Sequence, residues 1–378
     1  MDIMLSAEQK KFKQECRTFA EKEMSPLAAK YGETDEIHGE LVRVMADAGL
    51  FRLLVPEEMG GRGVQSMPIC LVREQLAGVY CAADVTFAMQ GLGSYPIVLA
   101  GSGEQKARFL PRLGSGEILS TYALTEPEAG SDVGSIASRA RETAGGFILS
   151  GLKRFISNGN AADMAVTFAK TPVPENPKAL SAFIVEKGME GFRVNKRLKT
   201  IAPHDLVELI FEDCFVPLEN LLGSVGDGMR IALKTLDRFR VSVGAAALGI
   251  AQRAFDDALG YAKKRVQFGR PIAGFQGIQF KLADMATELD AARGLVYRAA
   301  LVQDTKGEQI TRAASMAKMY ATEAAFRIVD SSLQIHGGLG VMAGSTVERL
   351  YREIRALRIY EGTTEIQKLI IAKSLTGN

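Results

Sequence analysis

The alternation of apolar and polar residues predicts helices at both ends of the chain and β-strands between them. Near the start, Phe12, Cys16 and Phe19 recur at helical spacing and would share one face of a helix. Ser6 stands just before this run, and Gln9 follows three residues later, which is the spacing of a capping box. The sequence therefore predicts a first helix that begins after Ser6.

Further periodic runs extend this helical pattern. In the first part of the chain we expect helices over residues 68–80 and 84–101, and a short one over 105–110 that Pro111 ends. The last part of the chain contains longer runs, over residues 229–264, 275–306, 309–335 and 364–375. Helices of this length are stabilised chiefly by packing of their apolar faces, so we expect them to form a bundle.

Short β-type runs separated by turn residues occupy the middle of the chain. They cover residues 118–124, 147–149, 153–156, 164–169, 182–185 and 207–211, and the third follows an expected turn at Ser150-Gly151. No amphipathic helical run lies between them, although a parallel pair of strands needs such a crossover. We therefore predict an antiparallel barrel or sandwich.

The order of these patterns predicts an α+β chain of three domains. Residues 1–118 would form an N-terminal helical domain, residues 119–225 the central β domain and residues 226–378 a domain like a four-helix bundle. A chain of 378 residues is long enough for several such cores.

Composition narrows the class of protein without changing this outline. The chain carries 46 basic and 44 acidic side chains, and a net charge of +2 favours neither nucleic acid nor a membrane surface as a partner. No run of about 18 apolar residues is present that could span a bilayer. Residues 1–6 also lack the basic start and apolar run of a signal peptide, so we expect a cytoplasmic protein.

The residues that most often bind metals are scattered along the chain. Neither the four cysteines nor the three histidines form a CxxC pair or another spacing typical of zinc ligands. We therefore expect buried thiols in place of disulfides, and no metal site.

Glu361 is the principal candidate for chemistry near the C-terminus. It follows Tyr360 and precedes Gly362, which supplies a bend between two helical runs. Thr364 and Gln367 have the spacing of a capping box for the last helix. A carboxylate at such a corner becomes a good base where burial raises its pKa. The alternative is an exposed loop glutamate, and residue chemistry by itself favours that alternative.

Three other segments combine glycine with polar residues. Residues 122–132 run from a strand into a loop rich in Pro, Gly, Ser and Asp, which either exposes backbone N–H groups or forms an ordinary turn. The glycines of residues 334–340 follow a helical run, whereas a dinucleotide-binding turn must follow a strand. A helix C-terminus is therefore favoured there over a close approach of the backbone to a cofactor. Residues 265–271 have the cations, glycine and proline of a helix end.

Together and in this order, these segments resemble the acyl-CoA dehydrogenase family over essentially the whole chain, in particular its short- and medium-chain-like bacterial members. The resemblance rests on residues 122–132, 153–159, 211–223, 265–269, 334–340 and 360–367. It implies the helix–β–helix fold of that family, a bound FAD and an acyl-CoA substrate. It also implies a homo-oligomer, usually a tetramer built as a dimer of dimers, and an electron-transfer flavoprotein as the electron acceptor.

The same resemblance implies dehydrogenation of the substrate to a trans-2-enoyl thioester. Glu361 matches the family's base, which removes the α-proton, while the β-hydrogen passes as hydride to flavin N5. The thioester carbonyl needs hydrogen-bond donors where negative charge develops. In the family these donors are the backbone N–H of the glutamate and a ribityl hydroxyl of FAD.

Other positions match cofactor and substrate contacts of the family. The positions matching FAD contacts are Tyr122, Leu124, Thr125, Phe155, Ser157, Arg265, Phe268, Gln276, Gln334, Gly337, Gly338, Thr363 and Glu365. Those from Arg265 to Gly338 would reach the ADP part of FAD across a subunit interface. The positions matching substrate contacts are Ser131, Asp237, Arg240, Tyr360 and Gly362.

The chain departs from the family pattern in two places. Phe155 and Ser157 occupy positions where relatives often have Trp and Thr, so an aromatic ring and a hydroxyl group are kept. Residues 201–207 replace a Gly-x-Arg-x-Ser-type stretch, and the residues alone offer no account of that change.

The particular substrate stays open within this class. The glutaryl type of this family carries an arginine for the distal carboxylate near the start of the corresponding helix. Residues 82–86 of this chain contain no basic side chain, so the resemblance disfavours a diacid substrate. Residues 87–95 would line the acyl pocket, with Gly91 and Gly93 leaving room for the acyl group. Two other functions fit the same fold. A flavoprotein oxidase is disfavoured because such enzymes usually carry an extra C-terminal domain, and a non-catalytic flavin-binding scaffold is disfavoured by the presence of Glu361.

Overall fold

The chain folds into two compact units, here called the helical unit and the sheet unit. The helical unit comprises Met1–Gly32, Ser66–Asp84 and Arg240–Asn378, and the sheet unit comprises Glu33–Gln65 and Val85–Phe239. The three-domain division stays a prediction. A computed structural model of the whole chain describes residues 5–173, 176–306 and 311–377, so the predicted start of a helix at 309 lies outside the described residues.

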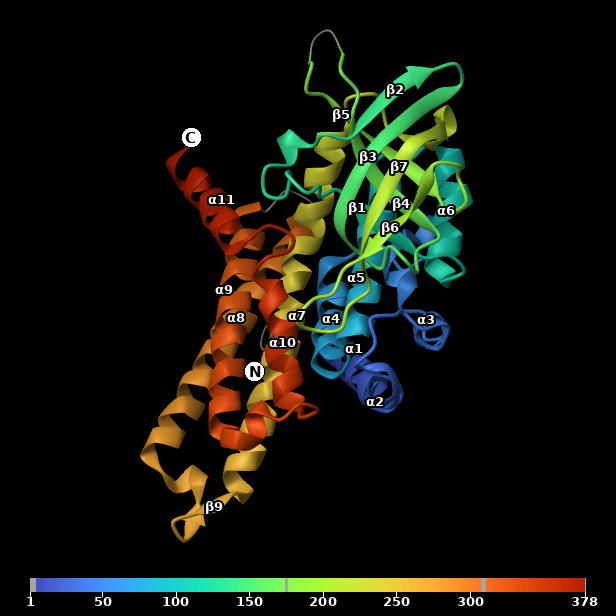
Figure 1. Cartoon of the computed structure of the whole chain (residues 1–378). Coiled ribbons are helices and arrows are strands. Elements are labelled where there is room, and N and C mark those ends of the chain that lie inside the picture. The colour runs from blue at the N-terminus through green and yellow to red at the C-terminus, as the bar shows by residue number, and fades with distance from the viewer. Residues whose placement is uncertain (1–4, 174–175, 307–310, 378) are drawn as a thin grey trace. The chain divides into compact units, whose positions relative to one another are not determined.

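The helical unit consists of helices and one short hairpin (Figure 1). The parts of the chain that lie in it alone are α1 (Ala7–Phe19), the π-helical η1 (Ala20–Met24), α2 (Ser25–Tyr31), α4 (Ser66–Val79), the hairpin of β9 (Val266–Gln267) and β10 (Arg270–Pro271), η6 (Ile272–Gly274), α8 (Gln276–Lys306), α9 (Thr311–His336), η7 (Gly337–Val341), α10 (Thr346–Leu357) and α11 (Thr364–Thr376). Two further helices, α5 (Cys81–Ala100) and α7 (Gly228–Lys264), contain residues of both units.

The start of α1 confirms the predicted capping box. The Ser6 hydroxyl accepts a hydrogen bond from the Gln9 backbone N–H at 3.1 Å, and the Gln9 side chain accepts one from the Ser6 N–H at 3.0 Å. These two bonds satisfy N–H groups that have no partner inside the helix.

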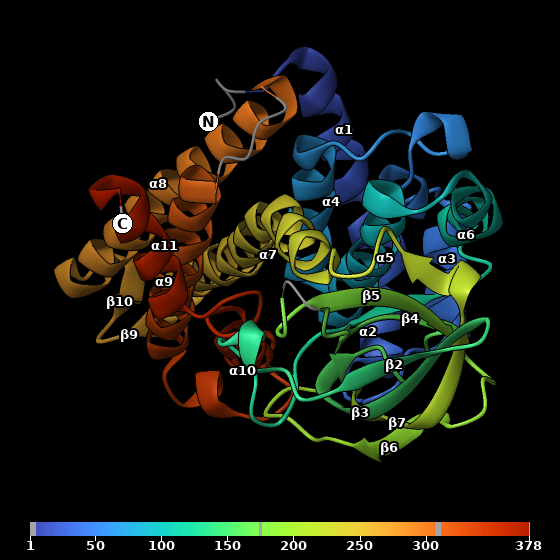
Figure 2. The same cartoon turned by 90° about the horizontal axis from the view of Figure 1, so that it is seen from above.

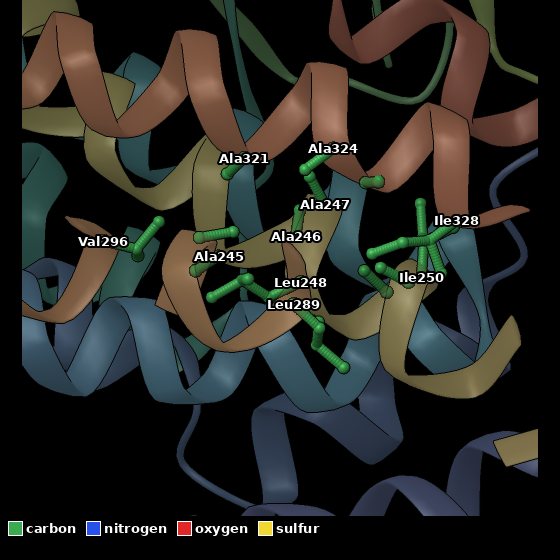
Figure 3. Packing of buried hydrophobic residues seen from close by; sticks show 14 of the residues in the cluster. Ala245, Ala246, Ala247, Leu248, Ile250, Leu289, Val296, Ala321, Ala324 and Ile328 are labelled. Carbon is green, nitrogen blue, oxygen red and sulfur yellow. The ribbon is translucent and has the colours of Figure 1, made fainter. Parts of the chain in front are cut away.

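The core of the helical unit combines small and branched residues from α7, α8 and α9. Ala245, Ala246 and Ala247 are fully buried against side chains of α8 and α9, among them Leu289 and Ile328 (Figure 3). Small side chains allow the helix backbones to approach closely, and the branched residues of the neighbouring helices fill the remaining space.

A buried ionic cluster ties α1, α4 and α8 together. The Glu74 carboxylate lies 3.2 Å from Lys13 Nζ and 3.4 Å from an Arg293 Nη atom, and it accepts a hydrogen bond from the Tyr297 hydroxyl at 2.5 Å. Removal of one partner would leave buried charge uncompensated.

The sheet unit contains one sheet with short helices around it. Its helices are α3 (Gly39–Asp47), η2 (Phe51–Leu54), η3 (Glu57–Met59), α6 (Gly103–Ser115), η4 (Val133–Ser135) and η5 (Leu218–Asn220). Its strands are β1 (Ser120–Ala123), β2 (Arg139–Thr143), β3 (Gly146–Ser157), β4 (Met164–Lys170), β5 (Leu180–Glu186), β6 (Phe192–Arg197), β7 (Leu206–Pro217) and β8 (Leu221–Leu222). They are ordered β6-β7-β3-β2-β4-β5-β8, and β1 pairs with β4. Figure 2 shows β2, β3, β7 and β6 following one another.

The predicted antiparallel β domain is confirmed, with one difference. Most neighbouring strands are antiparallel, but β1 runs parallel to β4 and β2 shares one parallel bridge with it. Alternate residues of the strands line two separate cores. Val166 and Ile184 face helices such as α6, whereas Ala165 and Val185 face the inner sides of other strands. The second core is that of a sheet folded on itself.

Three local predictions are wrong. The helix expected to end before Pro111 continues through it as α6, because Phe109, Leu110 and Leu113 are buried on its apolar face. That burial outweighs the helical hydrogen bond that proline cannot donate. The turn expected at Ser150-Gly151 is a bulge inside the continuous strand β3. The strands β2 and β6 were not expected at all, since their exposed polar residues lack an apolar alternation.

The described helices include none that is both long enough and apolar enough to cross a membrane. Within the same described residues, no group of histidine, cysteine and carboxylate side chains is arranged to hold a metal ion.

Candidate active site

Glu361 lies at the corner between α10 and α11 in the helical unit. Its φ angle is 53°, and that of Gly362 is 91°. The left-handed region costs a residue with a side chain roughly 1–2 kcal/mol, and such strained residues cluster at functional sites. The Thr364 N–H donates to the Arg358 carbonyl at 3.1 Å and closes the turn. The corner therefore holds Glu361 in a backbone conformation that it would not adopt alone.

The predicted capping box at the start of α11 is wrong by one residue. The N-cap is Thr363, whose hydroxyl accepts from the Ile366 N–H at 3.3 Å. The Thr364 hydroxyl instead donates to Glu323 on α9 at 2.6 Å. The Thr364 side chain thus binds a residue of another helix and does not cap α11. Gln367 also takes no part in the cap and makes other hydrogen bonds.

Two buried side chains hold the carbonyl groups of the corner. Gln367 Nε2 donates to the Glu361 carbonyl at 3.2 Å and to the Gly362 carbonyl at 3.0 Å. Lys318 Nζ donates to the same Gly362 carbonyl at 2.7 Å. Both side chains are fully buried, which fixes their rotamers and so the orientation of the two peptide groups.

The carboxylate of Glu361 is partly desolvated. The residue as a whole is partly exposed, but its Oε2 atom is buried and lacks a partner among the described residues. Burial raises the pKa of Glu361 above its ordinary value. The cations Arg73, Lys318 and Arg240 oppose this rise, and Asp84 adds to it. Such a carboxylate is a stronger base than an exposed one.

The largest of these opposing charges is already paired. Arg73 is buried and binds Asp84 through two hydrogen bonds of 2.7 and 2.8 Å, with a third of 2.9 Å to the Ser242 hydroxyl. Because Asp84 neutralises this guanidinium, Arg73 does not bind the Glu361 carboxylate as a direct ion pair.

Among the other predicted substrate contacts, Tyr360 and Gly362 lie at this corner, and Asp237 and Arg240 lie on α7. Burial raises the pKa of Tyr360 well above its ordinary value, so its hydroxyl stays protonated. Arg240 is buried, and its charge lowers the pKa of Glu361. Asp237 lies three residues earlier on α7 and is half-buried.

The sheet unit presents a second set of predicted residues at the end of β3. The pairing of β3 with β7 is interrupted between Lys153 and Ile156. Within this bulge Phe155 has a φ of 59°, and its side chain is 55% exposed. Bulges of this kind re-aim side chains next to functional sites. An aromatic ring is thus held outward, two residues before the Ser157 hydroxyl.

The segment 201–207, for which the residues gave no account, packs against Ser157. His204 Nε2 and Ser157 Oγ are 2.8 Å apart, and the His204 N–H donates to Asp35 at 3.1 Å. Burial lowers the pKa of His204 to about 4, with Asp35 opposing the shift, so the imidazole is neutral near pH 7. Asp205 also accepts from the Ala161 N–H at 3.2 Å. The segment therefore fixes the rotamer of Ser157.

The loop that follows β1 is anchored by a buried ion pair. Lys153 Nζ donates to Glu126 at 2.7 Å and to the Leu124 carbonyl at 3.3 Å, and Glu126 in turn accepts from the Ser138 N–H at 3.1 Å. Ser131 lies in the exposed part of this loop. The pair leaves the tip of the loop open to a ligand while its base stays fixed.

Two of the predicted cofactor contacts in this region point their side chains into the protein. The Tyr122 hydroxyl donates to the Ala232 carbonyl at 3.3 Å. The centroid of its ring lies 5.1 Å from the centroid of the Phe168 ring, in an edge-on arrangement. Leu124 is buried, whereas Thr125 is half-buried. Leu124 can therefore contact a cofactor mainly through its backbone, whereas the half-buried Tyr122 keeps part of its surface exposed.

The remaining predicted cofactor residues lie on the surface of the helical unit. Those classed as exposed are Arg265, Phe268, Gln276, Gln334, Gly337, Gly338 and Glu365, and Thr363 is half-buried. The predicted helix end at 334–340 is confirmed, because α9 ends at His336 and Gly337 has a φ of 60°. The His336 Nδ1 atom makes a hydrogen bond to the Ser332 carbonyl, and the imidazole stacks on the Tyr261 ring with 4.6 Å between the ring centroids.

These residues fit a flavin dinucleotide. The exposed ring of Phe155 beside the Ser157 hydroxyl suits an aromatic ring system with polar edges. No described atom lies within 4 Å of the place that a Cβ would take at Gly337 or Gly338, so a ligand could approach the backbone there. Arg265 offers a cation to a phosphate.

The room expected at Gly91 and Gly93 is already filled. A Cβ at Gly91 would lie 2.4 Å from the Phe239 ring and 3.1 Å from Leu54. A Cβ at Gly93 would lie 2.3 Å from the Ser120 hydroxyl. These glycines face protein side chains, so the room expected at them for an acyl group is taken up by Phe239, Leu54 and Ser120.

Comparison with known sequences identifies the family. Models of the acyl-CoA dehydrogenase N-terminal, middle and C-terminal domains match residues 6–117, 121–214 and 226–376. The chain is 44% identical to an acyl-CoA dehydrogenase of Bacillus subtilis (strain 168), over 99% of both chains. It is 41% identical to the acryloyl-CoA reductase (NADH) of Anaerotignum propionicum, over 99% of this chain and 96% of that one. The chain belongs to the acyl-CoA dehydrogenase family and is therefore an FAD-dependent oxidoreductase.

Solved structures agree with this assignment. Butyryl-CoA dehydrogenase from Megasphaera elsdenii has a TM-score of 0.94 at 36% identity, covering 99% of this chain and 100% of that one. A chain from the structure described as electron transferring flavoprotein of Acidaminococcus fermentans has a TM-score of 0.95 at 38% identity, covering 100% of both. An acyl-CoA dehydrogenase from Bacillus anthracis complexed with FAD has a TM-score of 0.92 at 35% identity, covering 99% of this chain and 68% of that one.

Reasoning from the sequence missed Lys318 and Arg73. Lys318 shares the apolar face of α9 with Ala314, Ala321 and Ala325, at helical spacing. A lysine among alanines on a buried face was the available signal. Arg73 lies within the buried run of α4 and offered a similar one.

Proposed function

We propose that this chain removes two hydrogens from the α and β carbons of a short acyl-CoA thioester, with Glu361 as the base. One observation carries the proposal: the Oε2 atom of Glu361 is buried without a hydrogen bond, at a strained corner. A general base needs a raised pKa and a free lone pair, and this carboxylate has both.

The proton step is local to the corner. The Glu361 carboxylate takes the proton from the α-carbon and becomes a neutral acid, which a buried site tolerates better than the anion. Negative charge then develops on the thioester oxygen. No described residue accepts a hydrogen bond from the backbone N–H of Glu361, so this N–H can donate to that oxygen.

Bound FAD would supply the two-electron acceptor for the β-hydrogen. In this chain Thr125, Phe155 and Ser157 would hold its ring system. Arg265, Phe268, Gln276, Gln334, Gly337, Gly338, Thr363 and Glu365 would hold the remainder. His204 keeps the Ser157 hydroxyl in place through the 2.8 Å contact.

A short acyl group is proposed from the packing around residues 87–95 and from the similarity to solved structures. If the acyl group lies against residues 87–95, the filled positions at Gly91 and Gly93 leave it little depth. A butyryl-CoA dehydrogenase among the similar structures supports a short acyl group as well.

An electron-transferring flavoprotein is the proposed electron acceptor, supported by the structural likeness described above. A cytoplasmic location also remains a prediction.

The function is tested by mixing the purified protein anaerobically with saturated acyl-CoAs of increasing length. We expect the visible flavin absorbance to bleach fastest with the shortest chains. Absorbance that stays constant with every acyl-CoA would contradict the proposal. Rapid peroxide formation in air during turnover would indicate an oxidase instead.

A second candidate is the reverse reaction, reduction of an enoyl-CoA. The likeness to an acryloyl-CoA reductase (NADH) favours it. In the presence of an electron-transferring flavoprotein, consumption of NADH that requires both this chain and an enoyl-CoA would support this direction. Bleaching by saturated acyl-CoA without such NADH consumption would support the first.

We further propose that the chain forms a homo-oligomer, a tetramer in its complete form, that shares FAD between subunits. The hairpin of β9 and β10 supports this, since Phe268 is 94% exposed there and Val266 is 52% exposed. A side chain as large as phenylalanine contributes about 1.5–3 kcal/mol when it is buried. A second copy of the chain is the partner that would bury it.

Phe268→Ser is expected to shift the protein toward smaller species and to lower its FAD content. Analytical ultracentrifugation and the ratio of flavin to protein absorbance measure the two effects. Leu218→Ser is the control, because Leu218 is 57% exposed in the sheet unit and outside the proposed sites. Unchanged sedimentation and FAD content in Phe268→Ser would contradict the shared site.

A further inference from the structure

Lys318 is a buried cation in the helical unit that family resemblance had not assigned to any role. It lies on α9 with no exposed surface, and α9 packs against α11. An isolated ammonium group in such a place is costly unless it is paired. Its neighbours should therefore reveal what the charge is for.

The ammonium group of Lys318 donates a hydrogen bond to the corner that carries Glu361. Lys318 Nζ donates to the Gly362 carbonyl at 2.7 Å, and Gln367 Nε2 donates to the same oxygen at 3.0 Å. Two donors on one carbonyl fix the plane of the peptide group between Gly362 and Thr363, directly after the left-handed pair Glu361 and Gly362. Left-handed residues relax to other conformations unless the surroundings hold them.

The charges that face Lys318 come from three helices and the corner itself. Glu361, Glu323 and Glu365 favour its charged form, and Arg240 opposes it. Burial outweighs them and lowers the pKa of Lys318 to about 8. Lys318 is therefore mostly protonated near pH 7 and loses its proton as the pH rises above about 8. Conversely, its charge lowers the pKa of Glu361.

We infer that Lys318 is a positioning residue for the base: its ammonium group holds the Gly362 carbonyl, and so the carboxylate and backbone N–H of Glu361, and it stabilises the ionised carboxylate. This inference rests on the proposed role of Glu361. It assigns a function to a buried charge, because replacing a buried ion by a hydrophobic side chain of similar volume is often neutral for stability.

The inference predicts the pH dependence of flavin reduction by a single equivalent of acyl-CoA. The wild-type rate should rise as Glu361 loses its proton and fall again above about pH 8 as Lys318 loses its own. In Lys318→Met the rate should drop about tenfold to a hundredfold, since small displacements of a catalytic group have effects of this size. The fall in rate at alkaline pH (the alkaline limb of the profile) should disappear. The rise in rate at acid pH (the acid limb) should move to higher pH, because removal of the cation raises the pKa of Glu361.

Two variants separate charge from position. Gln367→Met removes the second donor to the Gly362 carbonyl without changing any charge, so we expect a lower rate with the wild-type pH limbs. Arg312→Met removes an exposed cation from the same helix and should leave both the rate and the limbs unchanged. FAD content and thermal unfolding without substrate show whether each variant is folded.

The inference is overturned if folded Lys318→Met keeps the wild-type rate and both limbs. It is equally overturned if the wild-type profile shows no fall above about pH 8, a measurement that needs no variant. Failure of the proposed base is distinguishable, because Glu361→Gln would then reduce the flavin at the wild-type rate, and failure of the proposed activity would leave the flavin of the wild-type protein unreduced. An inactive Glu361→Gln beside a normal Lys318→Met removes only the role of Lys318.

Discussion

Glu361→Gln is expected to slow flavin reduction by acyl-CoA about 10²–10⁴-fold, the usual contribution of a general base. The amide has nearly the same shape as the carboxylate but cannot accept the α-proton. Binding of acyl-CoA should persist, because the contacts that hold the thioester do not require the negative charge. Stopped-flow absorbance under anaerobic conditions measures the rate, and the spectral shift of oxidised flavin on adding ligand measures binding.

The same variant should be more stable than the wild-type protein at neutral pH. Burial raises the pKa of Glu361 in the folded state above its unfolded value. The stability that Glu361 contributes is therefore present below the pKa of this residue in the unfolded chain. It is lost as the pH rises through the pKa of Glu361 in the folded protein. Glutamine is neutral throughout and avoids that loss. The melting temperature of Glu361→Gln should thus exceed that of wild type above this range and match it in acid.

A matched control is Glu15→Gln, which removes an exposed carboxylate from α1. It should change neither the rate nor the pH dependence of stability. Flavin bleaching at the wild-type rate in Glu361→Gln would show that another group removes the proton. A melting temperature that falls at neutral pH would show that the carboxylate is stabilised in the fold, contrary to its unbonded Oε2 atom.

Gly249→Ala is expected to destabilise the helical unit by about 3 kcal/mol or more, and to lower the melting temperature by roughly 5–10 °C. A Cβ at this position would lie 1.9 Å from the Glu74 carbonyl oxygen and 2.8 Å from its carbonyl carbon. These are backbone atoms of α4, which cannot turn aside as a side chain can. The two helices would have to separate.

Separation of α4 from α7 would also disturb the buried cluster around Glu74. Its carboxylate is held by Lys13, Arg293 and Tyr297, and displacement would leave these groups imperfectly paired. The cost of such unpairing adds to the steric cost. We therefore expect Gly249→Ala to exceed the usual effect of overpacking.

Gly260→Ala is the control on the same helix, since no atom lies within 4 Å of the Cβ that it would add. Alanine favours helix over glycine by about 1 kcal/mol, so this variant should be unchanged or slightly more stable. Thermal and urea unfolding of the two variants side by side measure the difference. Equal stability of Gly249→Ala and Gly260→Ala would contradict the close approach of α4 and α7.

Features that depend on neighbouring residues were predicted well from the sequence. The capping box at Ser6 and Gln9, and the end of α9 before Gly337, use groups only a few residues apart. The predictions failed where distant residues decide the outcome. Pro111 stays inside α6 because of the core that the helix faces, and Thr364 leaves the cap because Glu323 binds it.

The sequence by itself determined the helix–β–helix order, the family and the choice of Glu361 as candidate base. Periodicity, turn residues and motif order are properties of the chain, so they are visible without the fold. Only the tertiary structure decided that Glu361 has a buried oxygen without a partner, and that Lys318 supports the corner beside it. Burial and pairing join residues far apart in the chain: Lys318 is 44 positions from Gly362. The chemistry of the base is set by such contacts, because they control how much water and charge surround its carboxylate.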